Sequence, residues 1–173
     1  MTETETKPPT ETPFWRFSLD FYGRRGVSDA CIALQDGCGV DVNLLLFLFW
    51  IASGGWQVSV DDVKNLDDKA RNWRNLTIIP IRDVRRGLKG AATLVTSGKQ
   101  EDFRSKVKAV ELEAERLQQE ALYDVARSGP PGTEATPAAA ARGNIAAYEH
   151  LLSVSFPKQA TDILIDAFDR LAS

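Results

Sequence analysis

An almost unbroken apolar run from Leu44 to Ala52 constrains the fold of this chain more than any other feature. The run spans nine residues, about half of the ~20 that a membrane-spanning helix requires. Good helix formers fill it, Asp41 precedes it as a helix N-cap, and Gly54 follows it as a stop signal. These signals predict a helix over Val42–Ser53 that has no polar face. A helix of that kind must be surrounded by protein, so we expect it at the centre of the core.

Helical periodicity continues on both sides of this run, because apolar residues recur at spacings of three and four. The patterns predict helices at 14–22, 27–35, 42–53, 59–76, 80–98, 101–127, 138–153 and 158–172. The helix that begins at Pro80 is expected to bury a stripe made of Ile81, Val84, Leu88, Ala92 and Val95. The chain is therefore predicted to be all-α, an irregular helical bundle of seven or eight helices with a central apolar helix.

Composition divides the chain into four parts. Residues 1–13 are rich in threonine, glutamate and proline, so we expect a disordered N-terminal tail. The segment 128–137, SGPPGTEATP, holds three prolines and two glycines, which predicts a linker. The helical core domain is therefore expected at 14–127 and a C-terminal helical pair at 138–173.

The motifs of common enzyme and metal sites are absent from the sequence. It contains no phosphate-binding glycine loop, zinc-ligand spacing or nucleophile elbow. The only histidine, His150, has its neighbour Glu149 on a different helix face. We therefore predict no catalytic residue, no metal and no cofactor, and favour a protein that is not an enzyme.

Two features predict a cytoplasmic, bacterial-type setting. Cys31 and Cys38 have neither metal-ligand spacing nor a CxxC pattern, so we expect reduced thiols. The first twelve residues contain no apolar segment of the kind found in signal peptides. No membrane span is expected either.

Charge is strongly segregated along the chain. Residues 1–68 carry 5 basic and 11 acidic side chains, residues 69–108 carry 11 and 3, and residues 109–173 carry 5 and 10. A basic middle between acidic ends can bind an external anion, or its own flanks can neutralise it.

The basic residues of the middle part gather on one helix face, which we name the basic stripe. It consists of Arg82, Arg85, Arg86 and Lys89, extended by Arg71 and Arg74 on the preceding helix. Arginine binds carboxylates through forked hydrogen bonds, so an acidic counter-surface is expected. That surface is either an acidic protein partner or the chain's own Glu111, Glu113 and Glu115, and the sequence leaves both open. Nucleic acid is disfavoured because no aromatic residue alternates with these arginines.

Several short stretches together form a specific pattern. They are FW at 14–15, LQD at 34–36, G-x-DVNLLLF-x-x-W from Gly39 to Trp50, Trp73 followed by the arginines after Pro80, and EL-x-AE from Glu111. The pattern resembles a family of uncharacterised proteobacterial proteins over about Phe14 to Leu122. The resemblance implies a helical domain and no established activity.

The same stretches place polar residues beside the central helix. Asp36 and Asp41 are expected to cap or brace a turn, and Asn43 to bond to a neighbouring backbone group. The functional alternative is a polar ligand site formed by Trp15, Asp36, Asp41, Asn43 and Trp50.

Three functions are compatible with these patterns. The leading hypothesis is a non-enzymatic interaction or assembly factor that binds an acidic protein partner through the basic stripe, with the C-terminal helices as a regulatory or dimerising arm. The alternative is a small-molecule or lipid-binding helical protein with a polar site beside the core helix. The third is a homodimeric structural protein that uses the long helix at 101–127.

Overall fold

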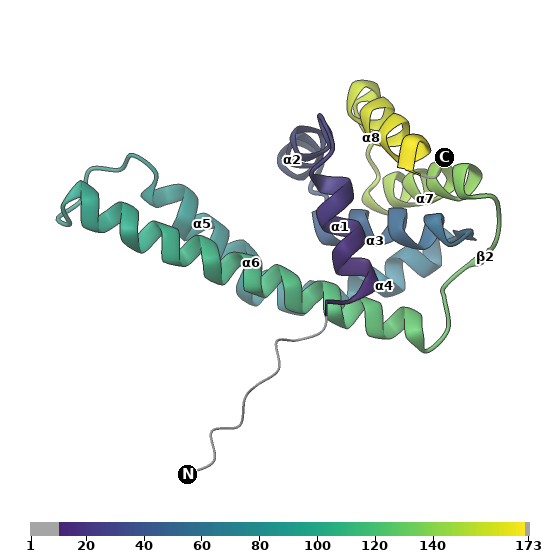
Figure 1. Ribbon diagram of the computed structural model, residues 1–173, viewed down its shortest axis with the longest axis horizontal. Coiled ribbons are helices and arrows are strands. Elements are labelled where there is room, and N and C mark those ends of the chain that lie inside the picture. The colour runs from purple at the N-terminus through teal and green to yellow at the C-terminus, as the bar shows by residue number, and fades with distance from the viewer. Residues whose placement is uncertain (1–10, 172–173) are drawn as a thin grey trace, which may run out of the picture.

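The computed structural model describes residues 11–171, which are predominantly α-helical (Figure 1). The elements are α1 (Pro13–Tyr22), α2 (Val27–Cys38), α3 (Val42–Ser53), β1 (Trp56–Gln57), α4 (Val60–Trp73), a π-helical turn (Arg74–Ile78), α5 (Ile79–Leu88), α6 (Ser97–Arg127), β2 (Thr133–Glu134), α7 (Pro137–Leu152) and α8 (Lys158–Leu171). The predicted all-α fold is confirmed. Most of the tail expected at 1–13 lies outside the described residues, and Pro13 already belongs to α1.

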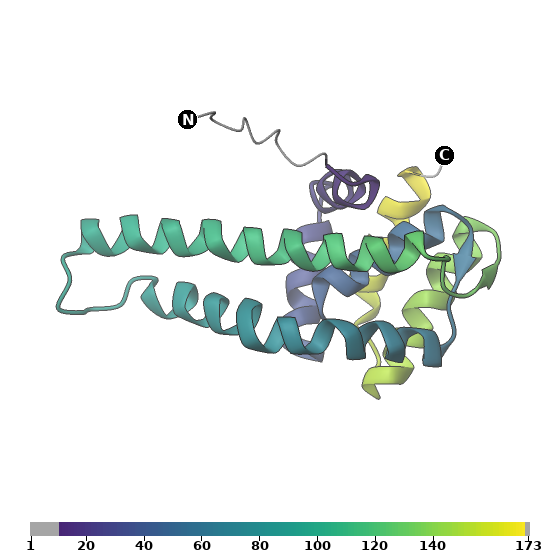
Figure 2. The same ribbon diagram turned by 90° about the horizontal axis from the view of Figure 1, so that it is seen from below.

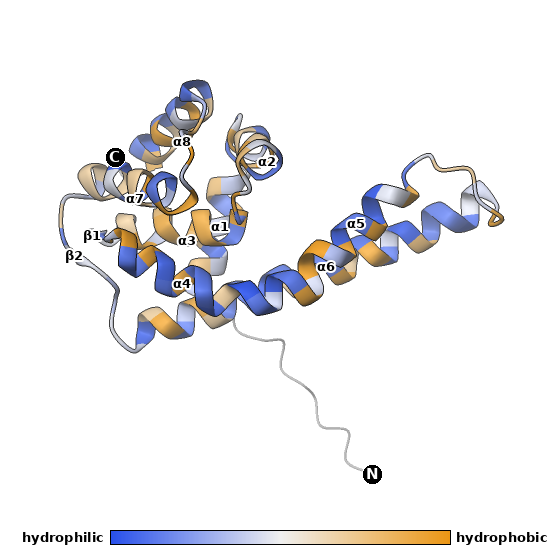
Figure 3. Cartoon of the chain, turned by 180° about the vertical axis from the view of Figure 1, so that it is seen from behind, coloured by the Kyte–Doolittle hydropathy of each residue, from blue (hydrophilic) through white to orange (hydrophobic). Residues whose placement is uncertain are grey.

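The apolar helix predicted over Val42–Ser53 is α3, with those same bounds. The Asp41 carboxylate caps it by accepting the backbone N–H groups of Asn43 at 2.9 Å and Leu44 at 3.3 Å. Every side chain from Asn43 to Phe49 is buried. Helices α1, α6 and α7 pack directly on α3, so it occupies the centre of the core (Figure 3). Within residues 11–171 no helix combines the length and apolarity needed to cross a membrane.

Helix α7 belongs to the same core as α3, although a Pro/Gly-rich segment precedes it. The buried Asn144 amide donates to the carbonyl groups of Leu48 at 3.0 Å and Trp56 at 3.1 Å. Its oxygen accepts the N–H of Val58 at 2.8 Å. The segment expected to be a linker runs along the core, where β2 pairs antiparallel with β1. Helices α7 and α8 therefore pack on the rest of their own chain.

Helices α4 and α5, joined by the π-helical turn, run antiparallel to α6; α4 packs on the core, whereas α5 and the first half of α6 project beyond it (Figures 1 and 2). We name the projecting part, which consists of α5, the first half of α6 and the loop at 89–96, the arm. Helix α6 has 31 residues and so is about 46 Å long. The arm places the basic residues of α5 beside the acidic residues of α6.

The prediction of a helix from residue 80 to residue 98 is wrong in its second half, because α5 ends at Leu88. Its expected buried stripe is also wrong. Val84 is 49% exposed, Val95 is 51% exposed, and no residue of α5 is buried. These side chains are exposed because of the tertiary arrangement: in a two-helix arm each helix packs against a neighbour on one side only.

The predicted break before Pro80 is bridged by the π-helical turn. Inside a regular helix the proline ring clashes with the carbonyl four residues earlier, and proline lacks an N–H donor. The turn widens the helix just before this point, and the N–H of Ile79 bonds to the carbonyl of Arg74, five residues back. The helix therefore continues from α4 into the arm.

Replacing Asn144 with alanine tests how α7 is held to the core. We expect Asn144→Ala to lower the free energy of unfolding by about 3 kcal/mol, because two carbonyls and one N–H lose their buried partner. Urea denaturation followed by circular dichroism measures the change. The control Asn65→Ala, at an exposed position of α4, should stay within about 0.5 kcal/mol of wild type. Equal losses in both variants would contradict the role of Asn144.

Candidate functional site

A pocket of about 210 Å³ opens between α1, α2, the start of α3, α5 and α6; we name it the main pocket. The exposed part of its lining is largely apolar and consists of Leu19, Tyr22, Ile32 and Leu112, each between 37% and 53% exposed, together with Arg86. The buried and half-buried part of its lining is mostly polar: Ser18, Asn43, Glu111 and Gln119 are buried, Arg82, Arg85 and Glu115 are half-buried, and Leu46 is the buried apolar member. The pocket therefore joins an apolar opening to a charged and hydrogen-bonding interior.

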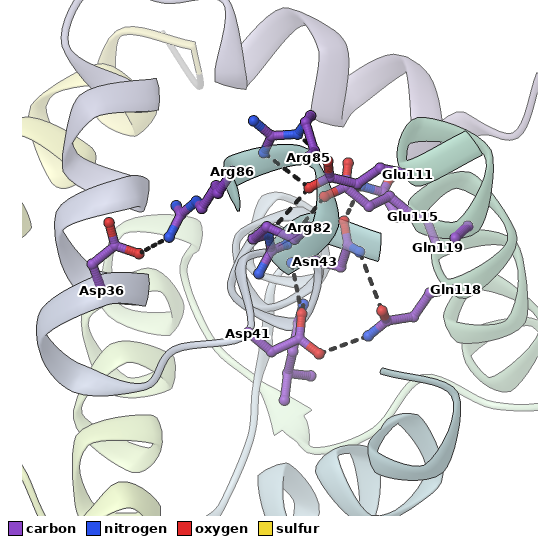
Figure 4. Close-up of polar contacts among 12 residues, drawn as sticks. Asp36, Asp41, Asn43, Arg82, Arg85, Arg86, Glu111, Glu115, Gln118 and Gln119 are labelled. Carbon is purple, nitrogen blue, oxygen red and sulfur yellow. Dashed lines mark hydrogen bonds and ion pairs between the residues drawn. The ribbon is translucent and has the colours of Figure 1, made fainter. Parts of the chain in front are cut away.

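The charged interior is a cluster of two arginines from α5 and two glutamates from α6 (Figure 4). Arg82 donates to Glu111 at 3.1 Å and to Glu115 at 3.3 Å. Arg85 makes a forked contact with both carboxylate oxygens of Glu111, one of them at 3.2 Å. Glu111 and Glu115 thus form an intramolecular counter-surface for these two arginines. Glu113 does not take part, because it pairs with Arg116 at 2.8 Å on the exposed side of α6.

The pKa values of the two glutamates of the cluster are shifted in opposite directions. Burial by itself raises the pKa of Glu111, but hydrogen bonds and charge from Arg85 and Arg82 outweigh it, so the pKa lies below its usual value. Burial raises the pKa of Glu115, and the nearby charge of Glu111 adds to the rise against the opposing effect of Arg82. A carboxyl group with a raised pKa in a pocket is a recurrent feature of functional sites.

The rest of the basic stripe is divided among other acidic groups. Arg86 bonds to Asp36 at 3.1 Å, and both side chains are about half exposed. Arg74 bonds to Asp41 and to Asp67, each at 2.8 Å. Arg71 pairs with Asp67 and Asp68 along α4. Among the six predicted partner-binding residues, only Lys89 makes no ion pair within residues 11–171.

Side-chain amides connect the start of α3 to α6. The Asn43 amide donates to Gln118 at 3.2 Å, and Asn43 accepts from the amide of Gln119 at 3.0 Å. Gln118 also donates to Asp41 at 2.7 Å (Figure 4). The expectation that the Asn43 side chain bonds to a neighbouring backbone group is therefore wrong. The two glutamines of α6 supply its partners, and they fix α6 against the first turn of α3.

Two buried polar atoms of the main pocket have no hydrogen-bond partner within the described chain. They are the hydroxyl oxygen of Ser18 and the amide oxygen of Gln119, and each residue is 3% exposed. A buried polar atom without a partner costs about 1–3 kcal/mol. Two such atoms on residues that line the same pocket suit a site where a water molecule or a ligand supplies the missing hydrogen bonds.

The predicted ligand-site residues divide between two hollows and the core. Trp15 and Asn43 line the main pocket. Asp36 and Asp41 line an adjoining hollow of about 300 Å³, which Asn43 also borders. Trp50 lines neither hollow. It packs against Phe14, with 5.4 Å between the centroids of the two rings. Within residues 11–171 no group of three metal-binding side chains occurs.

A family model described as a protein of unknown function, DUF2390, matches residues 13–122. The chain belongs to this family. The matched range includes every residue that lines the main pocket, whereas α7 and α8 lie beyond it. The resemblance predicted from the sequence is confirmed at the level of an uncharacterised domain family. Neither a curated protein nor a solved structure matches the chain.

Sequence reasoning missed Ser18, Gln118 and Gln119 as members of the site. The two adjacent glutamines were a usable signal, because they lie between apolar positions on the face of α6 that turns toward the core. Ser18 gave no signal, since one serine in an aromatic helix is compatible with any environment.

Removing the central carboxylate of the cluster tests its contribution to stability. Because the pKa of Glu111 is lowered in the folded state, its stabilisation is present at neutral pH and is lost as the pH falls through that lowered value. We expect Glu111→Gln to lower the free energy of unfolding by about 2 kcal/mol at neutral pH, and the difference from wild type to shrink in acid. Urea denaturation at several pH values measures both effects.

The matched control is Glu113→Gln, which removes an exposed ion pair from the same helix. Exposed pairs contribute little, so we expect a change below about 0.5 kcal/mol. If the two variants lose equal stability, the buried cluster has no special role.

Proposed function

We propose that this protein is a non-enzymatic binding protein that takes a small amphipathic molecule into the main pocket. One observation carries the proposal: Ser18 and Gln119, which both line a pocket with a largely apolar opening, each hold a buried polar atom without a hydrogen-bond partner among the described residues. Ligand pockets combine apolar walls with a few convergent polar groups in this way. This corresponds to the hypothesis of a helical protein with a polar ligand site beside the core helix.

The chemistry of the lining defines the ligand class. The carboxylates of Glu111 and Glu115 balance the charges of Arg82 and Arg85, so the interior does not favour a multiply charged ion. The Gln119 oxygen requires a donor, whereas the second terminal nitrogen of each arginine makes no hydrogen bond to another described residue. We therefore expect a polar or zwitterionic head group that both donates and accepts hydrogen bonds. An apolar body would lie against Trp15 and the exposed apolar residues of the opening.

Binding is favoured over catalysis because the pocket lacks a group prepared for bond making. Its arginines are held by its glutamates, and neither cysteine nor histidine is among its lining residues. The chain's histidine, His150, is exposed on α7. Glu115 has a raised pKa, but within the described residues it makes no hydrogen bond to the hydroxyl groups of Ser18 and Tyr22, which also line the pocket.

The test uses the dye anilinonaphthalene sulfonate, whose fluorescence increases in apolar pockets. We expect saturable binding to wild type. Ser18→Leu should abolish it, because leucine fills the pocket while the serine hydroxyl that it replaces makes no hydrogen bond. Leu112→Asp should weaken it about tenfold by making the opening polar, which corresponds to about 1.4 kcal/mol.

The matched control is Leu117→Asp on the same helix. Leu117 is 40% exposed and borders a separate apolar groove beside Trp73. We expect this variant to bind the dye as wild type does, and circular dichroism to show that every variant is folded. Loss of binding in Leu117→Asp but not in Leu112→Asp would place the site in that groove and would overturn the proposal. Native mass spectrometry of the purified protein then looks for a co-purifying ligand.

Binding of an acidic protein partner through the basic stripe is the second candidate function. Two residues favour it: Lys89 makes no ion pair within residues 11–171, and the Arg86 side chain is 44% exposed. A native pull-down with nuclease treatment would compare wild type, the double variant Arg86→Glu/Lys89→Glu, and the control Lys69→Glu, which changes an exposed position of α4. One protein recovered with wild type and the control but lost with the double variant supports this function. Equal recovery in all three contradicts it.

Three other properties expected from the sequence are still predictions. They are the proteobacterial origin of the family, a bacterial cytoplasm as the setting, and a homodimer formed through α6. The free state of Cys31 and Cys38 supports the second. The mass in solution, measured by light scattering, tests the third.

A further inference from the structure

The loop that joins α5 to α6 lies at the far end of the arm, away from the core (Figures 1 and 2). Together with the first three residues of α6 it forms the segment 89–99, KGAATLVTSGK, which has a lysine at each end and is uncharged and partly apolar between them. Leu94 is fully exposed, and Val95 is 51% exposed. We name this segment the tip loop.

The tip loop is held in one conformation by the buried side chain of Gln100. Its amide donates to the carbonyl groups of Leu88 and Ala91, each at 2.9 Å, and its oxygen accepts from the hydroxyl of Thr93. The Thr93 oxygen in turn accepts the N–H of Val95 at 3.2 Å. Backbone groups that would otherwise require water are thus bonded inside the loop, which reduces the cost of placing it in a medium without water. The two largest apolar side chains remain on its outside.

The surroundings of the tip loop are basic. Lys89, Lys99, Lys106 and Lys108 make no ion pair within residues 11–171, whereas Arg104 pairs with Glu101. Asp102 and Glu101 are the only acidic residues between positions 84 and 110. An exposed apolar tip with free lysines beside it is complementary to an anionic surface that has an apolar interior.

We propose that the tip loop anchors the protein to an anionic lipid bilayer. Leu94 and Val95 enter the boundary between head groups and acyl chains, while Lys89 and Lys99 lie among the anionic head groups. A protein partner is less suited to this composition. The tip loop lacks tryptophan, tyrosine and arginine, the residues that are enriched among the energetically important residues of protein interfaces. The main pocket then faces solvent beside the membrane.

Sedimentation with lipid vesicles tests the proposal on the full chain. We expect wild type to sediment with vesicles of equal parts phosphatidylglycerol and phosphatidylcholine, and to stay in solution with phosphatidylcholine alone. Leu94→Ser/Val95→Ser should reduce the partition coefficient at least about tenfold. Lys89→Gln/Lys99→Gln should reduce it about fivefold for each lysine, and added salt should weaken wild-type binding.

Matched controls keep the type of substitution and change its place. Leu76→Ser alters a side chain that is 70% exposed at the base of the arm, and Lys69→Gln alters an exposed lysine of α4. Both should sediment as wild type does, and so should Ser18→Leu, which separates this test from that of the main pocket. If wild type does not sediment with anionic vesicles, the proposal fails. It also fails if Leu94→Ser/Val95→Ser sediments as wild type does, because the protein then only adsorbs through charge.

Discussion

The buried carboxylate of Asp41 is the contact on which the arrangement of the helices depends. One of its oxygens caps α3, and the other accepts from Arg74 at the base of the arm and from Gln118 on α6. The backbone N–H of the same residue donates to the Tyr148 hydroxyl on α7 at 2.9 Å. One residue therefore sets the start of the core helix against three other elements. A charge at this depth is tolerable because every side of it is hydrogen-bonded.

Local signals explain why parts of the fold were predictable. The helix over Val42–Ser53 and its Asp41 cap depend on residues within a few positions of each other. Burial in the arm was not predictable in this way. Val84 fits an amphipathic pattern, yet whether it meets another layer is decided by where α1, α2 and α7 pack, and they pack on the core. Periodicity indicates which face of a helix is apolar, but it does not indicate which other element, if any, covers that face.

The candidate site shows the same division between local and tertiary information. The spacing of Arg82 and Arg85 predicted that they share one helix face. The charge pattern predicted that either an acidic partner or the chain's own glutamates, including Glu111 and Glu115, lie opposite them. Only the antiparallel packing of α5 on α6 brings these groups within hydrogen-bond distance. The pocket itself requires five elements that meet at the start of α3. No sequence pattern places the Ser18 hydroxyl there, because α1 is positioned by its aromatic residues and not by that serine.

The unpartnered atoms of the main pocket are significant because the network around them is otherwise complete. Asp41, Asn43 and Gln118 bond to one another, and the Gln119 amide nitrogen joins them, so only its oxygen is left over. An apolar residue in place of Ser18 would avoid the cost of a buried hydroxyl and would also fill space. A site built only for stability would therefore be apolar at position 18, whereas Gln119 also serves stability through its hydrogen bond to Asn43. A pocket that exchanges water for a ligand requires the polar atoms to be present and free before the ligand arrives.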